Sequence, residues 1–225
     1  MPDERSEELA TAHQDWDARW TIADQRSRWD RAEPLVSALV PLLRARRFTR
    51  VLDVGSGIGR HAHYLAREGF QCTGIDASEA GLAYAREQAA AAGLEIDYRA
   101  AQFYELPVAD SSFDAAIAWN VVYHGDGEIA QRGIDEIARV LRPAGLFVGT
   151  MLSKRNAGFG VGREVRPDTF VVDGADTDKS HPHFYCDATT LLRLHRGFEV
   201  LNLRDREQVP GAFHWEFTFE RSAHL

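Results

Sequence analysis

The chain has 225 residues, of which 44% are hydrophobic, and a formal net charge of −8 at pH 7. This length fits one domain with a core large enough to fold without a disulfide or metal staple. The acidic balance, with no concentrated basic stretch, argues against a nucleic-acid-binding protein and favours a small-molecule partner.

The first 48 residues predict a helical lid that precedes the main domain. Trp16 and Trp20 are four residues apart and would lie on one helix face, either covering a ligand or docking the helix onto the core. The beginning, MPDERSEELA, is polar, and no apolar run approaches the length of a membrane span. We therefore expect no membrane segment and a cytoplasmic location.

Residues 49–152 alternate between short apolar runs and amphipathic helices. Three helices are expected within this range, at residues 60–69, 78–93 and 130–141, and a further helix is expected before it, at residues 34–43. The apolar runs predict five strands, at residues 50–54, 70–76, 94–100, 113–119 and 145–152. This βαβ alternation indicates a parallel sheet with helices on both faces.

The composition changes after the fifth predicted strand. Residues 153–186 contain many Gly, Asp and Pro residues, which predicts a long loop or insertion over the substrate side. A helix at 187–195 and two alternating strands at 198–205 and 213–221 follow, the last strand antiparallel to its neighbour. We therefore expect residues 49–225 to form one doubly wound, mostly parallel, seven-stranded α/β domain.

A glycine-rich turn, GSGIG at residues 55–59, follows the first predicted strand directly. Dinucleotide-binding proteins use G-x-G-x-x-G, whereas here the third glycine comes one residue early and Arg60 occupies its place. Asp53 precedes the glycines, and Asp76 ends the second strand, where an acid can bind ribose hydroxyls. Two carboxylates fit a cationic nucleoside such as S-adenosylmethionine, although each could instead cap a helix.

Four segments, in order, make residues 48–152 resemble the class I S-adenosylmethionine-dependent methyltransferases. They are VLDVGSGIG, GIDAS, LPVADSSFDAAIAWNVVYHG and LRPAGLFVGT. Within that family, GRHAHYLA and WNVVYHG look like the small bacterial tellurite-resistance and quinone-pathway enzymes, which act on small molecules.

The resemblance implies cofactor-binding roles for ten residues. They are Asp53, Gly55, Ser56, Gly57, Gly59, Asp76, Ala77, Gln102, Phe103 and Asn120. One of them departs from the family pattern, because Gln102 stands where relatives usually have an acid that accepts from the adenine amino group. Its carbonyl can still accept that hydrogen bond.

Candidate catalytic residues follow the fourth strand. Tyr123 and His124 should lie near the sulfonium, where His124 would act as a base or would only hold the loop. Trp20, His183 and Tyr185 are candidate substrate-binding residues, with packing as the alternative. The nine histidines show no ligand spacing on one element, so we expect no metal.

The sequence thus predicts an enzyme that transfers a methyl group from S-adenosylmethionine to an O, N or S atom of a small molecule. Two alternatives remain open. The domain could bind the cofactor without catalysis, or, against the evidence of the glycine spacing, it could be an NAD-dependent oxidoreductase.

Overall fold

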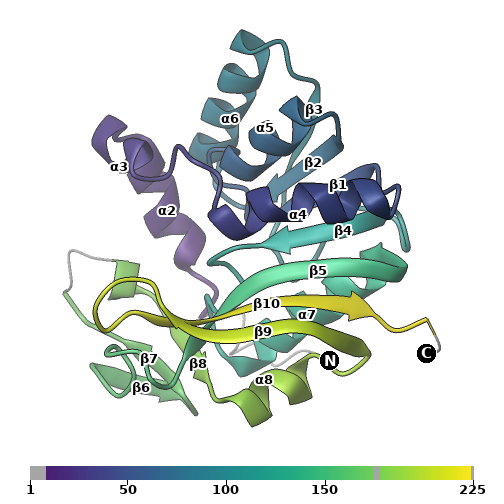
Figure 1. Ribbon diagram of the computed structural model, residues 1–225. Helices are drawn as coiled ribbons and strands as arrows, with labels where there is room; N and C mark the ends of the chain where they lie inside the picture. The colour runs from purple at the N-terminus through teal and green to yellow at the C-terminus, as the bar shows by residue number, and fades with distance from the viewer. Residues whose placement is uncertain (1–8, 175–177, 224–225) are drawn as a thin grey trace.

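A computed structural model describes residues 9–174 and 178–223, which form a twisted sheet covered on both faces by helices (Figure 1). Seven main strands run in the order β3-β2-β1-β4-β5-β10-β9. They are β1 (Arg50–Val54), β2 (Gln71–Asp76), β3 (Ile96–Ala100), β4 (Phe113–Ala118), β5 (Leu141–Ser153), β9 (Phe198–Glu207) and β10 (Phe213–Arg221). Strands β1 to β5 are parallel and β10 is antiparallel to both β5 and β9, which confirms the predicted seven-stranded sheet.

The helices divide between the two faces of the sheet. Their bounds are α2 (Ala12–Trp20), α3 (Ala23–Ser27), α4 (Pro34–Ala45), α5 (Arg60–Arg67), α6 (Glu79–Ala91), α7 (Gly127–Val140) and α8 (Ala188–Leu194). Helices α4, α5 and α6 cover one face, and α7 and α8 cover the other. Helix α4 belongs to the segment expected as a lid, yet its apolar side packs in the core.

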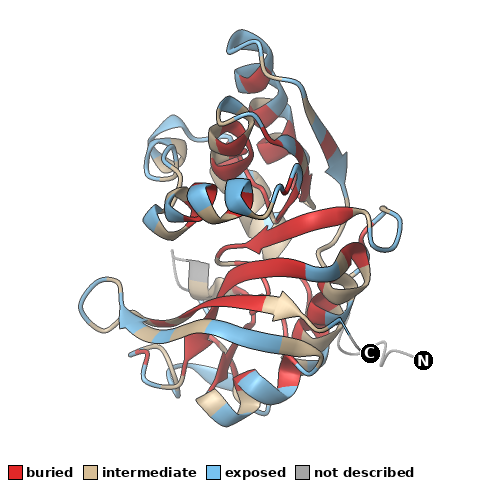
Figure 2. Cartoon of the chain, turned by 45° about the vertical axis from the view of Figure 1, so that its right-hand side comes forward, coloured by how far each residue is buried: buried red, intermediate tan, exposed pale blue. Residues whose placement is uncertain are grey.

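Two hydrophobic clusters, one on each face, hold the helices to the sheet. Successive strand residues point to opposite faces, so Leu52 joins the cluster under α7 whereas Val51 joins the cluster under α4 to α6. The central strand β4 is buried along its whole length, while the edge strand β9 is largely exposed (Figure 2). This is why β4 reads in the sequence as a continuous apolar run.

The segment from 153 to 186, predicted as a long loop or insertion, contains short elements of secondary structure. It contains β6 (Arg163–Arg166), β7 (Thr169–Val171), the 3-10 turn η1 (Asp178–Ser180) and β8 (His183–Cys186). Strand β8 pairs with the end of β5, and β7 pairs with β8 in the antiparallel sense. The composition did not reveal these strands because each is only three or four residues long. That the segment covers the substrate side stays a prediction.

Within the described ranges, the helices are all too short or too polar to cross a membrane.

Candidate functional site

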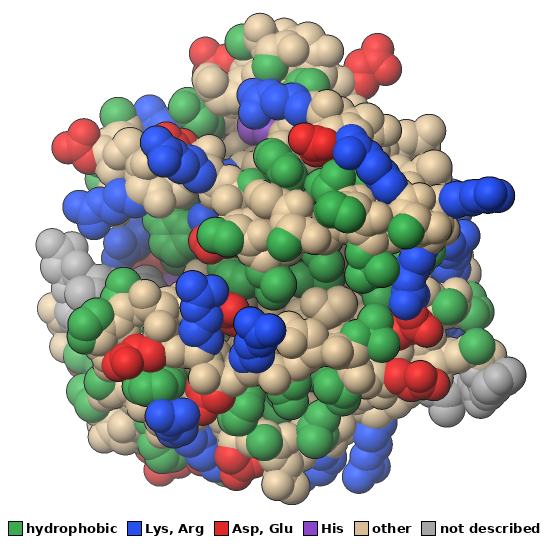
Figure 3. Space-filling view, in the orientation of Figure 1, with side chains coloured by type: hydrophobic (Ala, Val, Ile, Leu, Met, Phe, Trp, Pro, Cys, Tyr) green, Lys and Arg blue, Asp and Glu red, His purple; other side chains and the backbone are tan. Residues whose placement is uncertain are grey.

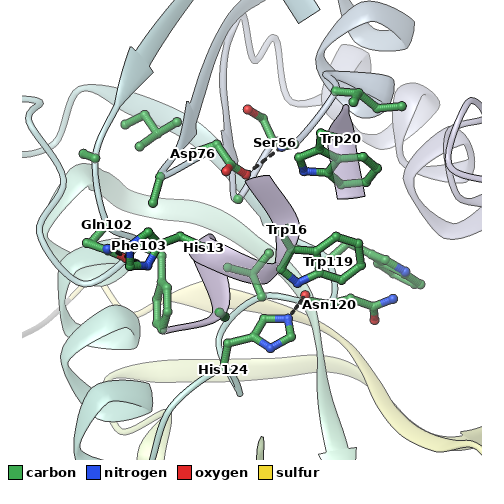
Figure 4. Close-up of a pocket in the computed structure, with 18 of the residues that line it drawn as sticks. His13, Trp16, Trp20, Ser56, Asp76, Gln102, Phe103, Trp119, Asn120 and His124 are labelled. Carbon is green, nitrogen blue, oxygen red and sulfur yellow. Dashed lines mark hydrogen bonds between the residues drawn. The ribbon is translucent and has the colours of Figure 1, made fainter. Parts of the chain in front are cut away.

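A pocket opens at the carboxyl ends of β1, β2 and β4, where ligands bind in open parallel sheets. Helix α2 lies across it, so the walls come from both the sheet and the N-terminal segment (Figure 4). The lining residues are Ala10, Ala12, His13, Trp16, Trp20, Trp29, Gly55, Ser56, Gly57, Ile58, Arg60, His61, Ile75, Asp76, Ala77, Ala101, Gln102, Phe103, Trp119, Asn120, Val121 and His124.

The glycine-rich turn forms the floor of this pocket. Gly57 has φ of +51°, and an ideal Cβ on it would lie 3.0 Å from Cζ2 of Trp20. A side chain here would therefore strain the backbone and press on the indole. Glycine at this position lets the turn approach whatever the pocket holds.

The N–H groups of the turn are directed at strand β2. Gly55 and Ser56 both donate to the carbonyl of Ile75, at 2.7 and 3.0 Å. Gly57 donates to Asp76 Oδ2 at 2.7 Å. A phosphate-binding turn instead points its N–H groups at the ligand, so this turn is not built to bind a pyrophosphate.

Asp76 joins the pocket to helix α6. Its Oδ1 accepts from the N–H of Ser78 at 2.8 Å, so the carboxylate does cap this region while it also lines the pocket. Burial raises the pKa of Asp76 to about 6, although hydrogen bonds from the Ser78 and Gly57 N–H groups act in the opposite direction. Each oxygen keeps a second lone pair with which to accept from a ligand hydroxyl.

Gln102 and Phe103 lie side by side in the pocket wall (Figure 4), and Ala77 also lines the pocket; their contact with an adenine stays a prediction. The amide Nε2 of Gln102 lies 3.3 Å from Nδ1 of His13 on α2. His13 was not identified from the sequence, because an isolated polar residue on a surface-like helix gives no signal of what it will face.

Asn120 is fixed beyond the end of β4 in a left-handed conformation, with φ of +59°. Its N–H donates to Thr150 Oγ1 at 2.8 Å, and that hydroxyl donates to Asn120 Oδ1 at 2.9 Å. Its carbonyl accepts from Nε2 of His124 at 2.9 Å. The polypeptide therefore turns sharply here and presents Asn120 and His124 to the same pocket.

Tryptophans form the opposite wall. Trp16 and Trp20 lie on one face of α2 with ring centroids 5.0 Å apart, as their spacing predicted. Trp29 meets the edge of Trp16 at 5.6 Å. Trp119, which the sequence reading missed, closes the wall from the end of β4. Aromatic faces of this kind accommodate a cationic ligand.

Arg60 contributes a desolvated cation to the pocket. Its guanidinium forms an ion pair with Glu33 at 2.9 Å and lies 4.9 Å from the ring of Trp29. Burial lowers the pKa of Arg60, although Glu33 and Asp53 act to raise it. In the sequence, Arg60 served only to distinguish the glycine turn from that of dinucleotide-binding proteins. In the structure it lies in the pocket wall.

Asp53 and Gly59 lie behind the pocket instead of lining it. Asp53 Oδ2 accepts from the N–H of Ala62 at 3.2 Å, which is the helix-capping role that the sequence left open. Gly59 has φ of +81° and begins α5, where a side chain would collide with Tyr98. Contact of either residue with a ligand stays a prediction.

Tyr123, His183 and Tyr185 are buried in the core beside the pocket and are absent from its lining. The ring of Tyr123 packs 4.8 Å from that of His124, and Tyr185 packs against Phe170. Their predicted catalytic and substrate-binding roles stay predictions, because the structure gives these side chains no direct contact with the cavity. His183 does, however, approach His124 closely.

Comparison with known proteins finds methyltransferases by sequence and by fold. A family model described as a methyltransferase domain matches residues 51–145. The ubiquinone biosynthesis O-methyltransferase of Paramagnetospirillum magneticum is 38% identical over 113 residues, which cover 50% of this chain and 44% of that protein. The chain thus matches less than half the length of this curated relative.

Solved structures share the fold across most of the chain. The 1,6-didemethyltoxoflavin-N1-methyltransferase of Burkholderia thailandensis superposes with a TM-score of 0.71 at 20% identity, covering 99% of this chain and 92% of that one. The cyclase SpnF gives a TM-score of 0.62 at 25% identity, covering 82% and 80%. The fold is therefore established, and it also serves a protein named for a different reaction.

Proposed function

We propose that this protein, whose residues 51–145 match a family model described as a methyltransferase domain, is a class I S-adenosylmethionine-dependent enzyme that methylates an O, N or S atom of a small molecule. The observation that supports this best is one pocket that joins a glycine floor, the Asp76 carboxylate and a tryptophan wall. A nucleoside with a cationic, amino-acid-bearing tail needs these three surfaces together.

The residues fit such a cofactor in detail. The Asp76 carboxylate would accept hydrogen bonds from the ribose hydroxyls, and the adenine would be bordered by Ala77, Gln102 and Phe103. The glycine turn and Asn120 would enclose the methionine portion, with Arg60 placed to bind its carboxylate.

Three buried polar atoms on pocket residues support this fit. Ser56 Oγ, His61 Nε2 and Trp119 Nε1 have no hydrogen-bond partner within the part of the chain that is described. Buried polar atoms without partners are rare in proteins. A polar ligand in this pocket would give them partners.

S-adenosylmethionine, when bound, supplies an activated methyl group on a sulfonium sulfur. The protein's task in such a displacement is to align the acceptor behind the methyl carbon and exclude water. The tryptophan wall would exclude water and favour the positive sulfonium. We propose that α2, which carries Trp16 and Trp20, is the lid that closes over the bound cofactor.

His124 is proposed as a positioning group rather than as a free base. Its Nε2 bonds to the carbonyl of Asn120, and its Nδ1 lies 2.9 Å from Nε2 of His181. Burial, followed by the charges of His181 and Lys179, lowers the pKa of His124 well below its ordinary value. Because Nδ1 of His124 lies against the buried ring of His181, His124 is poorly placed to take a proton from the methyl acceptor, which must be activated in another way.

A small-molecule acceptor fits the surface as well as the pocket. On the face shown in Figure 3, Lys and Arg side chains are interspersed with Asp and Glu rather than gathered in one patch. Nucleic-acid binding requires a concentrated basic surface. This supports, for the face in view, the expectation of a small-molecule partner.

Calorimetry with S-adenosylmethionine, S-adenosylhomocysteine and NADH tests the cofactor. We expect the first two to bind with micromolar or tighter affinity and NADH not to bind. A coupled assay for S-adenosylhomocysteine formation, with phenols, ring amines and thiols offered as acceptors, then tests turnover. Binding without turnover for every acceptor would favour a non-catalytic domain, or a different reaction such as that of the cyclase; NADH binding would favour the oxidoreductase.

A further inference from the structure

Three buried histidines meet beside the pocket although they come from two distant segments. His124 follows β4, whereas His181 and His183 flank Pro182 at the start of β8, and His124 and His183 form an antiparallel β-bridge. One nitrogen from each ring lies within 4.8 Å of the other two. The exposed fractions of the three residues are 7%, 2% and 0%, so the cluster is closed to bulk solvent.

The outer nitrogen of each ring is bonded to a group that can only accept. His124 Nε2 faces the carbonyl of Asn120 at 2.9 Å, and His183 Nδ1 faces the carbonyl of His181 at 2.8 Å. His181 Nδ1 faces Asp15 Oδ2, also at 2.8 Å. The outer nitrogens must therefore carry the protons, and in neutral rings the three inner nitrogens carry lone pairs.

Asp15 orients His181 from the side away from the cluster. Its Oδ2 accepts from Nδ1 of His181 and from Oγ of Ser180, both at 2.8 Å. A histidine whose outer nitrogen donates to a carboxylate or carbonyl is the usual arrangement around protein-bound metals. Each of the three histidine rings has its outer nitrogen bonded in this way.

The inner nitrogens are too close to be explained as neutral rings alone. His124 Nδ1 and His181 Nε2 are 2.9 Å apart, yet neither has a proton to donate to the other. His183 Nε2 is fully buried and has no hydrogen-bond partner among the described residues. A proton between the first two rings would leave His183 unsatisfied, whereas a metal ion would satisfy all three.

We propose that His124, His181 and His183 bind a divalent transition-metal ion of the Zn²⁺ type. Imidazole nitrogens suit Zn²⁺, Fe²⁺, Co²⁺ and Ni²⁺, and three nitrogens about 2.1 Å from a tetrahedral ion would be about 3.4 Å apart. The three inner nitrogens already lie within 4.8 Å of one another, so small movements of the rings would bring them to the spacing that the ion requires. Two charged groups influence the histidines: Lys179 contributes an opposing positive charge, and Asp15 offsets it.

The position of the cluster suggests what the metal does. His124 also lines the pocket, and three protein ligands leave a coordination position open. If the proposed methyl transfer holds, a hydroxyl acceptor bound there would have its pKa lowered by the metal, so it would release its proton to solvent and attack the methyl carbon as an alkoxide without a general base from the protein. Asp15 and Trp16 lie on α2, so the same site would link the proposed lid to the acceptor.

The test uses the full-length chain stripped with a chelator and titrated with ZnCl₂ in the absence of any cofactor or acceptor. We expect one equivalent bound with sub-micromolar affinity, and a visible absorption spectrum of a four- or five-coordinate ion when Co²⁺ replaces zinc. His183→Gln should weaken binding by at least about 100-fold, and Asp15→Asn by about 10- to 100-fold. His195→Gln, which alters a buried histidine outside the cluster, should bind as wild type does.

X-ray absorption of the zinc-loaded wild-type protein keeps the test decisive if a variant fails to fold. Three imidazole ligands are expected. Absence of stoichiometric binding, fewer than three imidazoles, or unchanged affinity in His183→Gln would overturn the proposal, and the short contact would then be a shared proton. Because S-adenosylmethionine plays no part in these measurements, their outcome is separate from that of the methyltransferase proposal.

Discussion

The N–H of Gly57 donates to Oδ2 of Asp76 at 2.7 Å, so the glycine turn after β1 and the acid that ends β2 form one unit. The two residues are 19 apart in sequence, and the bond fixes the carboxylate at the pocket edge. Any change to Asp76 therefore alters the shape of the turn as well as the charge that a ribose would meet.

Replacing Asp76 by Asn should weaken S-adenosylhomocysteine binding by roughly 100-fold, because hydrogen bonds to a charged acceptor contribute about 1.5 to 3 kcal/mol. Calorimetry measures the change. Asp97→Asn, which alters an exposed acid on neighbouring β3, is the matched control and should leave affinity unchanged. Equal affinity in Asp76→Asn and wild type would remove Asp76 from the cofactor site.

The same carboxyl should make cofactor affinity depend on pH. Its pKa in the folded protein is about 6, and the ribose hydroxyls require the ionised form. Affinity should therefore rise as pH increases through 6 and fall about tenfold for each unit below it. Titrating the dissociation constant from pH 5 to pH 8 checks this, and the dependence should flatten in Asp76→Asn.

Trp20 and Gly57 should show coupled effects on cofactor binding. Gly57→Ala should destabilise the left-handed backbone of the turn by about 1 to 2 kcal/mol. It also adds a methyl group 3.0 Å from the Trp20 ring. In a Trp20→Ala background the backbone cost remains but the steric contact is gone. A double-mutant cycle on cofactor affinity should thus give a smaller effect of Gly57→Ala when Trp20 is absent; strict additivity would refute the contact.

Thr150 should stabilise the turn at Asn120 through its hydroxyl. Thr150→Val removes the acceptor of the Asn120 N–H and the donor to Asn120 Oδ1, which should lower the free energy of unfolding by about 2 kcal/mol. Thr150→Ser keeps the hydroxyl and is the control. Urea denaturation distinguishes them, and a Thr150→Val variant as stable as wild type would show that the hydroxyl does not stabilise the turn.

His195 should make the fold sensitive to acid. Burial among Phe147, Phe217 and Phe219 lowers the pKa of His195 to about 4 from 6.5, whereas the unfolded residue takes up a proton below pH 6.5. The stability gained by keeping His195 neutral is therefore complete above pH 6.5 and is lost as pH falls to 4, a change of about 3 kcal/mol.

Denaturant unfolding of wild type and His195→Phe between pH 7 and pH 4.5 tests this. The variant should lose less stability over that interval, since a phenyl ring does not titrate. Parallel pH profiles for the two proteins would show that His195 does not contribute to the acid sensitivity.

The strands of the central sheet could be predicted because each one is recognisable from its own short stretch of sequence. Buried parallel strands are short apolar runs, and residues 50–54 and 113–119 lie within one residue of β1 and β4. The helix expected at residues 78–93 is present as α6, and Ser78 caps it, because its Oγ accepts from the N–H of Gly81. The small strands of residues 153–186 escaped prediction because each is only three or four residues long. In addition, β8 pairs with the end of β5 across the whole intervening segment, where Leu152 meets Tyr185.

The sequence by itself determined the doubly wound sheet, the glycine turn and the residues Asp76, Gln102 and Asn120 at its edge, since strand ends gather wherever parallel strands align. Only the tertiary structure decided that Asp53 caps α5 and that Tyr123 lies behind the pocket wall. It also brought His124 to His181, 57 residues away, with Asp15 behind them. Spacing along one element cannot encode such a cluster, because its geometry arises from the packing of a bridge, a loop and a helix that meet only in the folded chain.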